Sequence, residues 1–185
     1  MPIVLDGTNG VTTNSGTLIS ATTIGVGGAT PSTSGAGITF PATASASSNA
    51  NTLDDYEEGT WTPVYTGASG SAGTAAYSSS GAYIKVGNLV TLRGTITVSD
   101  KGSWSAKILI TGCPFPPSTS VYPAVSVGLW YNYATSVLSV SGYLNGTGGQ
   151  IVPLHQTGAS TANIETLVSN IATGWTYEFS LSYPI

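Results

Sequence analysis

The chain has 185 residues, and only 6% of them are charged, whereas a typical globular domain carries about 25%. Its 41% of hydrophobic residues exclude an intrinsically disordered chain, which is charged and poor in apolar side chains. The four Lys and Arg residues are too few to neutralise a run of phosphates, so neither nucleic acid nor an anionic membrane is an expected partner.

A chain so poor in charge stays soluble through hydroxyl and amide groups, or it hides its surface in an assembly, as secreted, fibrous or virion proteins do. The opening "MPIVLDGTNG" turns polar after five residues, so no signal peptide is predicted. No apolar run approaches the roughly 20 residues of a membrane helix, and no membrane insertion is predicted. We expect synthesis and assembly in a cytosol.

Residues 1–52 contain no Lys, Arg, Glu, Trp or Tyr. Their apolar residues come in islands of one to three, separated by Gly, Ser, Thr and Asn, and neither helical nor long strand periodicity is sustained. Such a segment cannot bury enough apolar area alone to offset the entropy of ordering it. The segment is therefore expected to be a flexible tail, or to pack against copies of itself or a larger partner.

Residues 53–59, "LDDYEEG", hold half of the eight acidic residues of the chain. Thr52 fits a helix N-cap, Asp55 three residues later completes a capping-box pattern, and Gly59 fits a left-handed stop. The stretch predicts a short helical junction. Its four carboxylates, which could bind a cation as a minor alternative, belong to Asp54, Asp55, Glu57 and Glu58.

Residues 60–185 alternate β-branched or aromatic residues with small polar ones. "AYIKVGNLVTLRGTITVS" predicts a hairpin that turns at Gly87-Asn88, with Val90, Leu92, Ile96 and Val98 on one face of its second arm. Further strands are predicted by "GTWTPVYT", "SWSAKILI", "YPAVSVGLW", "SVLSVSGYL", "GQIVPLH" and "WTYEFSLSY". "TANIETLVSNIA" fits a short helix or a strand plus turn. We predict an all-β fold with an antiparallel, jelly-roll-like β-sandwich head.

Catalytic chemistry finds little support in the sequence. Four carboxylates on one turn resemble a solvated capping face more than a glycosidase pair, whose members come from separate elements. His155 lies in "IVPLHQT" without a G-x-S-x-G elbow, so a structural histidine is favoured. Cys113, the only cysteine, fits a buried small hydrophobe, and one Cys with one His makes no zinc site. No enzyme activity, no metal and no cofactor are expected.

The segment "LWYNYA" contains the candidate binding residues. Strand alternation would place Trp130 and Asn132 on one face and Tyr131 and Tyr133 on the other. Exposed rings beside an amide suit carbohydrate, because rings stack on the apolar faces of sugars while amides bind hydroxyls. The alternative is that these residues, like Trp61, Trp104 and Trp175, belong to the core or to a subunit interface.

The stretch "ITFPATASASSNANTLDDYEEGTWTPVYTG", the hairpin "GAYIKVGNLVTLRGTITVS", the element "ITGCPFP" and the closing "WTYEFSLSYPI" together resemble the C-terminal modules of bacteriophage tail fibres and related virion fibre or spike proteins. Position 113 is Cys where that family often has Leu. The resemblance implies homotrimers, with residues 1–52 as an extended attachment and trimerisation shaft bound to the particle and residues 60–185 as a β-rich head that meets the host surface.

The resulting hypothesis is a non-enzymatic tail fibre or spike/head fibre, located on the virion. Residues 1–52 would bind other tail or capsid proteins, and the head would adhere to host cell-surface polysaccharide. The first alternative is a decoration or connector protein without receptor contact. The second is a glycan-degrading tailspike.

Overall fold

The computed structural model describes residues 4–6, 10–12, 23–49, 51–68, 73–117, 122–146, 148–159 and 161–185. The chain divides into two compact units, Met1–Asp55 and Tyr56–Ile185, which we describe separately.

The described residues of the first unit form four strands of three residues each. β1 (Val4–Asp6) pairs antiparallel with β2 (Gly10–Thr12), and β3 (Thr23–Gly25) pairs parallel with β4 (Gly37–Thr39). None of its described residues joins the buried core cluster of the protein. Large apolar side chains are instead exposed, by 36–58%, at Ile24, Val26, Ile38 and Leu53.

The predicted helical junction at residues 53–59 is wrong. Residues 53–55 have no regular structure, and β5 (Tyr56–Trp61) begins directly after them. β5 pairs antiparallel with β7 (Ala76–Val86) over six residue pairs and buries Trp61 at its end. A capping box stabilises a helix end by only about 1 kcal/mol, so the ladder with β7 and the burial of Trp61 decide the conformation.

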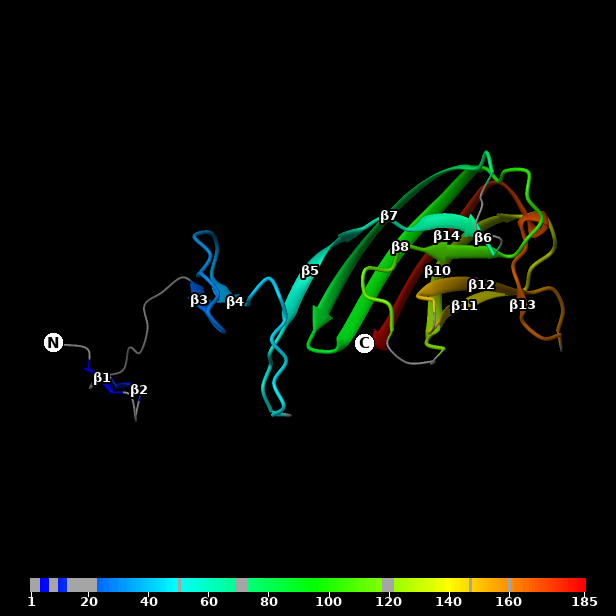
Figure 1. The fold of residues 1–185 in the computed structure, drawn as a ribbon. Coiled ribbons are helices and arrows are strands. Elements are labelled where there is room, and N and C mark those ends of the chain that lie inside the picture. The colour runs from blue at the N-terminus through cyan, green and yellow to red at the C-terminus, as the bar shows by residue number, and fades with distance from the viewer. Residues whose placement is uncertain are drawn as a thin grey trace. The chain divides into compact units, whose positions relative to one another are not determined.

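The second unit is one curled antiparallel sheet, which confirms the all-β prediction (Figure 1). Its order is β5-β7-β8-β14-β10-β11-β12-β9-β6, with β13 paired to β12. The remaining strands are β6 (Val64–Gly67), β8 (Leu89–Asp100), β9 (Ile108–Thr111), β10 (Ala124–Tyr133), β11 (Ser139–Asn145), β12 (Gln150–Gln156), β13 (Ile164–Glu165) and β14 (Ile171–Pro184). A 3₁₀ turn at Val168–Asn170 follows β13, so "TANIETLVSNIA" is strand plus turn.

The hairpin of β7 and β8 confirms the predicted turn and the predicted alternation. The strands meet at Gly87-Asn88, where Gly87 has a φ of 55°, a value that favours glycine in a two-residue turn. Along β8 every second side chain is inaccessible to solvent, and these are Val90, Leu92, Ile96 and Val98. The alternation is clear because this strand packs one face on the core and leaves the other in water.

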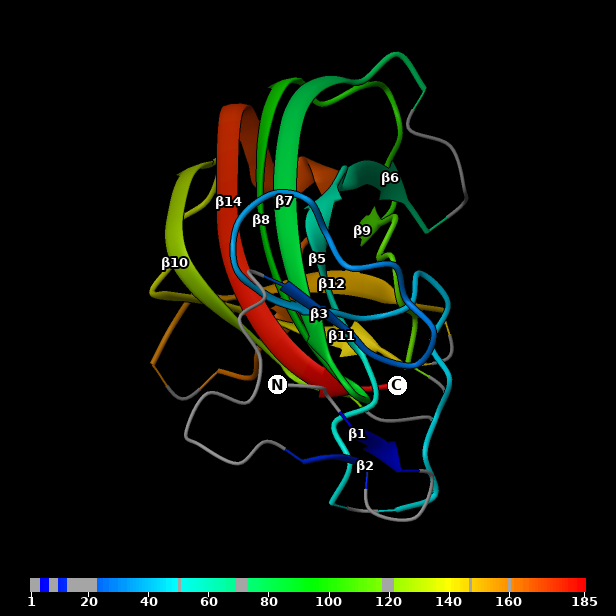
Figure 2. The ribbon, with the colours of Figure 1, turned by 90° about the vertical axis from the view of Figure 1, so that its left-hand side faces the viewer.

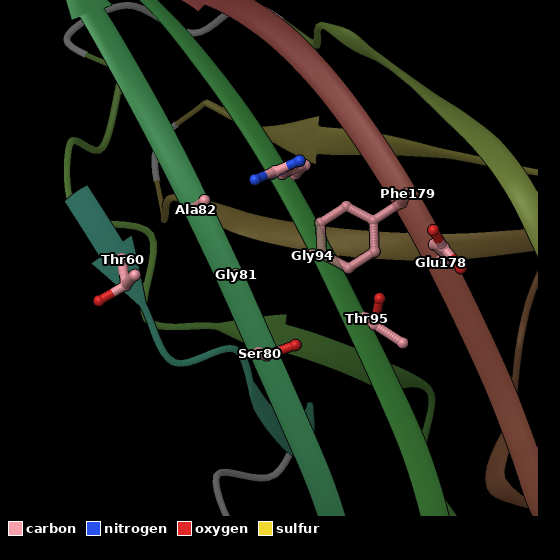
Figure 3. A pocket seen from close by; sticks show the side chains of 9 residues that line it. Thr60, Ser80, Gly81, Ala82, Gly94, Thr95, Glu178 and Phe179 are labelled. Atoms are coloured by element: carbon pink, nitrogen blue, oxygen red, sulfur yellow. The ribbon is translucent and has the colours of Figure 1, made fainter. Parts of the chain in front are cut away.

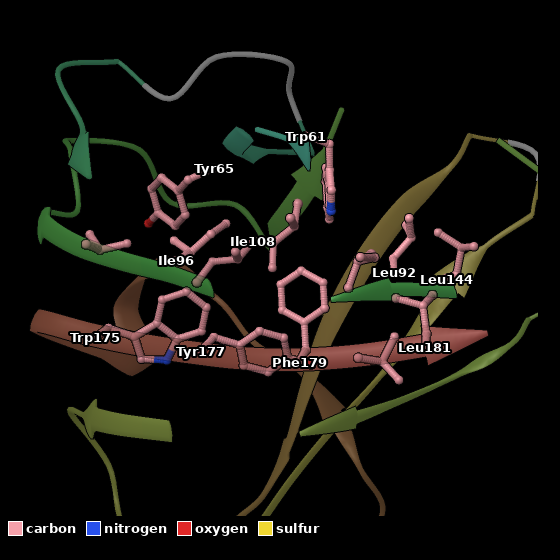
Figure 4. Close-up of a cluster of buried hydrophobic side chains, with 14 of the residues drawn as sticks. Trp61, Tyr65, Leu92, Ile96, Ile108, Leu144, Trp175, Tyr177, Phe179 and Leu181 are labelled. Carbon is pink, nitrogen blue, oxygen red and sulfur yellow. The ribbon is translucent and has the colours of Figure 1, made fainter. Parts of the chain in front are cut away.

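The core lies between the two halves of the curled sheet, and aromatic rings from β14 fill much of it (Figure 4). Trp175 stacks on Tyr177 at 5.5 Å between ring centroids, and Tyr177 lies 5.5 Å from Phe179. The Tyr177 hydroxyl donates to Ser141 O in β11 at 2.8 Å. These contacts tie β14 to the opposite half of the sheet. Trp61 and Trp175 are buried in the core, and Trp104 is partly buried against it, as the core alternative predicts.

Two glycines let rings lie directly on the sheet backbone. Gly81 in β7 faces Gly94 in β8 across the ladder. A Cβ at Gly81 would come within 2.3 Å of Trp61 Nε1, and a Cβ at Gly94 within 2.6 Å of Phe179 Cζ. Trp61 Nε1 donates to Arg93 O at 3.0 Å, so its ring cannot move away without losing that bond.

The core also contains one histidine, His155 in β12, with no exposed surface. Its Nδ1 lies 3.1 Å from Thr166 Oγ1, and its Nε2 has no hydrogen-bond partner in the described part of the chain. Burial lowers the pKa of His155 below its usual value because the charged ring would lose its hydration.

Gly81→Ala should destabilise the protein by about 1–3 kcal/mol, because the added methyl group overpacks the ring of Trp61. Urea unfolding followed by Trp fluorescence measures the change. Gly128→Ala in β10 is the matched control, since nothing lies within 4 Å of the Cβ it would add. Equal unfolding midpoints for the two variants would contradict this packing.

Acidification should destabilise the protein through His155. Unfolding exposes the ring and restores its ordinary pKa of 6.5, so the unfolded state takes up the proton first as the pH falls. The free energy of unfolding should therefore decrease below pH 6.5, by at most about 1.4 kcal/mol per pH unit, until the folded-state pKa is reached. Urea unfolding at pH 7, 6 and 5 measures it.

The matched variant for that measurement is His155→Asn, which cannot take up a proton near neutral pH. His155 is the only histidine of the chain, so the variant should show a flatter pH dependence between 7 and 5. The same slope in both proteins would show that another group carries the effect.

Candidate functional site

The candidate site lies on the face of the sheet that points away from the core. We call it the outer face, and it is formed by the outward side chains of β5, β7, β8, β14 and β10. Four of these strands, β7, β8, β14 and β10, lie side by side in Figure 2. Their register places Arg93 opposite Ser180, Thr95 opposite Glu178, and Thr176 opposite Tyr131.

Two neighbouring hollows open on the outer face. The first has a volume of 360 Å³, and its polar walls are Thr60, Ser80, Arg93, Thr95 and Glu178. Ser80, Thr95 and Glu178 lie on three adjacent strands in Figure 3. The second hollow, of 650 Å³, shares the walls Thr60, Ala82 and Arg93 with the first.

Tyr131 extends the outer face from the first hollow along β10. It is 53% exposed and pairs with Thr176, whose neighbour on the same face of β14 is Glu178. Leu129 pairs with Glu178 and is 38% exposed, so an apolar surface adjoins the polar hollow. Of the four predicted binding residues, Tyr131 is the one whose ring is exposed on this face.

A β-bulge at Asn132 overturns the predicted alternation of the segment. Asn132 has a φ of 58°, and the register shifts between Tyr131 and Tyr133. The Asn132 Nδ2 donates to Gly174 O at 3.0 Å, which fixes the bulge. The extra residue reorients the strand, so Tyr133 no longer shares a face with Tyr131.

Tyr133 and Trp130 lie toward the core side of β10. Their rings meet edge to face at 5.6 Å, and the Tyr133 ring lies 5.5 Å from that of His155 and 6.2 Å from that of Trp175. Burial raises the pKa of Tyr133 above its usual value. Both residues are half-buried, so the core alternative describes them better than an open sugar platform does.

The four carboxylates of residues 53–59 lie apart from one another, because part of the stretch forms strand β5 and not the predicted helix. Asp54 accepts the amide of Ser47 at 2.6 Å, and Asp55 is buried. Glu57 accepts the Tyr83 hydroxyl at 2.5 Å, which raises the pKa of Tyr83 above its usual value. Glu58 accepts the Tyr56 hydroxyl at 2.8 Å. Among the described residues, no three His, Cys, Asp or Glu side chains group to hold a metal ion.

Cys113 is half-buried and packs against the core. Burial raises the pKa of its thiol to about 12, so the reactive thiolate is scarce at neutral pH. This environment fits the predicted role as a small hydrophobe.

Sequence reasoning missed Arg93 and Glu178 as a pair. Both are charged residues in strands of otherwise small or apolar residues, and both fall on the polar phase of the alternation. Their rarity in a chain with 6% charged residues was the available signal. Their proximity was not visible, because it depends on the register between β8 and β14.

Within the described segments, no helix is long and apolar enough to cross a membrane.

Comparison with known proteins supports the fold. No family model and no curated protein sequence matches the chain. The structure is similar to the crystal structure of Dettilon tailspike protein (gp208), with a TM-score of 0.58 and 22% sequence identity. The match covers 69% of this chain and 23% of that one, so the chain corresponds to less than a quarter of the tailspike's length. At this identity the likeness shows a shared fold.

Proposed function

We propose that the protein is a virion component of a bacteriophage, a tail fibre or a spike/head fibre, whose second unit binds polysaccharide on the host surface. The similarity to the fold of a phage tailspike protein is the observation that carries this proposal. The sequence motifs that resemble fibre and spike modules support it independently.

The outer face supplies the contacts that such adhesion needs. Its hydroxyl groups, one guanidinium and two carboxylates, those of Glu58 and Glu178, match the hydrogen-bonding groups of sugars, and Tyr131 offers an exposed ring. A shallow site of this kind binds weakly, and several copies on one particle raise the overall strength of attachment. Binding without cleavage is part of the proposal.

The first unit supports the proposed attachment to the particle and to further copies. Ile24, Val26 and Ile38 are exposed, and burial of such side chains against other chains would contribute about 25 cal/mol for each Å². We propose that residues 1–52 hold the protein in a homotrimer and bind it to other tail or capsid proteins.

Immunogold labelling of particles of the phage that encodes the chain tests the location. Antibody against the second unit should label the particle, and purified protein should reduce adsorption of the phage to its host in proportion to its concentration. A particle that is not labelled would refute the virion assignment. Labelling without any effect on adsorption would favour a decoration or connector protein, and release of sugars from the host envelope would favour a glycan-degrading spike.

Removal of residues 1–52 tests the division of roles. Light scattering of the full chain should give the mass of three 18.6 kDa copies at micromolar concentration, whereas the truncated protein should be a monomer. The truncated protein should keep a β-rich circular dichroism spectrum and a cooperative unfolding transition. A monomeric full chain would refute the trimer, and an unfolded truncated protein would refute the proposed division.

A further inference from the structure

We infer that the outer face recognises a saccharide that carries an acidic group, with Arg93 as the anchor of that group. This inference names the class of ligand for the polysaccharide adhesion proposed above, and it depends on that proposal.

The three lysine side chains already interact with other groups of the protein. Lys85 is buried, and its Nζ lies 5.7 Å from the centroid of the Phe115 ring. Lys101 Nζ donates to Ile171 O at 3.1 Å, and Lys107 Nζ lies 2.9 Å from Glu165 Oε1. Arg93 is the only arginine, and its guanidinium has neither a hydrogen bond nor an ion pair within the described segments.

The position of the Arg93 guanidinium favours an anionic ligand. Arg93 is exposed on the outer face and lines both hollows. Because the Glu58 carboxylate also lines the second hollow, we expect the anion at the first. A guanidinium presents two parallel N–H groups that match the two oxygens of a carboxylate or of a sulfate ester. An uncommitted Arg in a hollow therefore favours a ligand with a planar or tetrahedral oxyanion.

Polar side chains surround Arg93 in the first hollow. Glu178 lies diagonally across from it on β14, and its carboxylate has no partner among the described residues either. A carboxylate only accepts hydrogen bonds, so it selects hydroxyl groups and repels a second anion. Thr60, Ser80 and Thr95 add hydroxyls that both donate and accept. The hollow thus suits a polyhydroxylated ligand whose single acidic group points toward Arg93.

The surface between Arg93 and Tyr131 is long enough for several sugars. Arg93 pairs with Ser180 and Tyr131 with Thr176, so the two residues are separated by two strand spacings and four residues along β14. This corresponds to about 17 Å. The acidic group would lie at Arg93, sugar hydroxyls at Glu178 and Thr95, and the apolar face of a further sugar on Leu129 and Tyr131. The ligand is therefore a chain of several sugars.

Glycan binding by the full-length protein tests the inference. The probes are neutral oligosaccharides that end in one uronic acid residue, their uncharged methyl esters, neutral dextran oligomers, and an array of oligosaccharides that carry one sulfate ester or one sialic acid. At least one acidic probe should bind ten-fold or more tightly than its neutral counterpart, and the preference should weaken as salt screens the charge. The carboxylated and sulfated probes separate the two possible anions.

Three variants locate the site. Arg93→Gln should reduce binding of the acidic probe to the level of its neutral counterpart, whereas Glu178→Gln and Tyr131→Ala should weaken binding of charged and neutral probes alike. Lys107→Gln removes one positive charge from a residue outside the outer face and should leave the affinity unchanged. Urea unfolding of each variant shows that a loss of binding is not a loss of structure.

The inference is overturned if acidic and neutral probes bind alike, if no acidic probe binds, or if Arg93→Gln retains the preference. Binding of the same proteins to cells of the phage host separates this failure from failure of the proposed function. Wild-type and Arg93→Gln proteins that bind the cells equally would refute the inference and leave surface adhesion standing. A wild-type protein that binds no host cells would refute the proposed function itself.

Discussion

The register of β14 is the constraint on which the rest of the structure depends. Its inward side chains, from Trp175 to Tyr183, are buried, and the strand pairs with β8 over ten residues and with β10 on its other side. A shift of the register by one residue would expose every buried ring of β14 to solvent, so the aromatic core fixes the register strongly. The same register determines which residues lie opposite one another on the outer face.

Core packing thus determines the positions of the residues in the candidate site. Glu178 points outward because Tyr177 and Phe179 on either side of it point inward. Arg93 points outward because Leu92 is buried and Gly94 leaves room for the Phe179 ring. The two charged side chains stand on strands that are held by hydrogen bonds on both sides, so their spacing is preorganised rather than assembled on binding.

Local signals predicted local structure well, and they failed where partners far along the chain decide the outcome. The β7–β8 hairpin follows from its turn residues and alternation, which are contiguous in sequence. The capping signals around Asp55 predicted a helix because the pairing of β5 with β7 cannot be seen locally. The Tyr83 hydroxyl that donates to Glu57, for example, lies 26 residues along the chain. The bulge at Asn132 could not be predicted for the same reason, since it depends on a hydrogen bond to the distant carbonyl of Gly174.

The acidic stretch "LDDYEEG" has a consequence for aggregation. β5 carries Glu57 and Glu58 on opposite faces, and in the described sheet it pairs on one side only, with β7. An unpaired edge strand is a template for unwanted pairing between chains, and charged side chains of both orientations prevent a second strand from docking there. In a chain with so few charges, two carboxylates at this edge protect the sheet when many copies are crowded together.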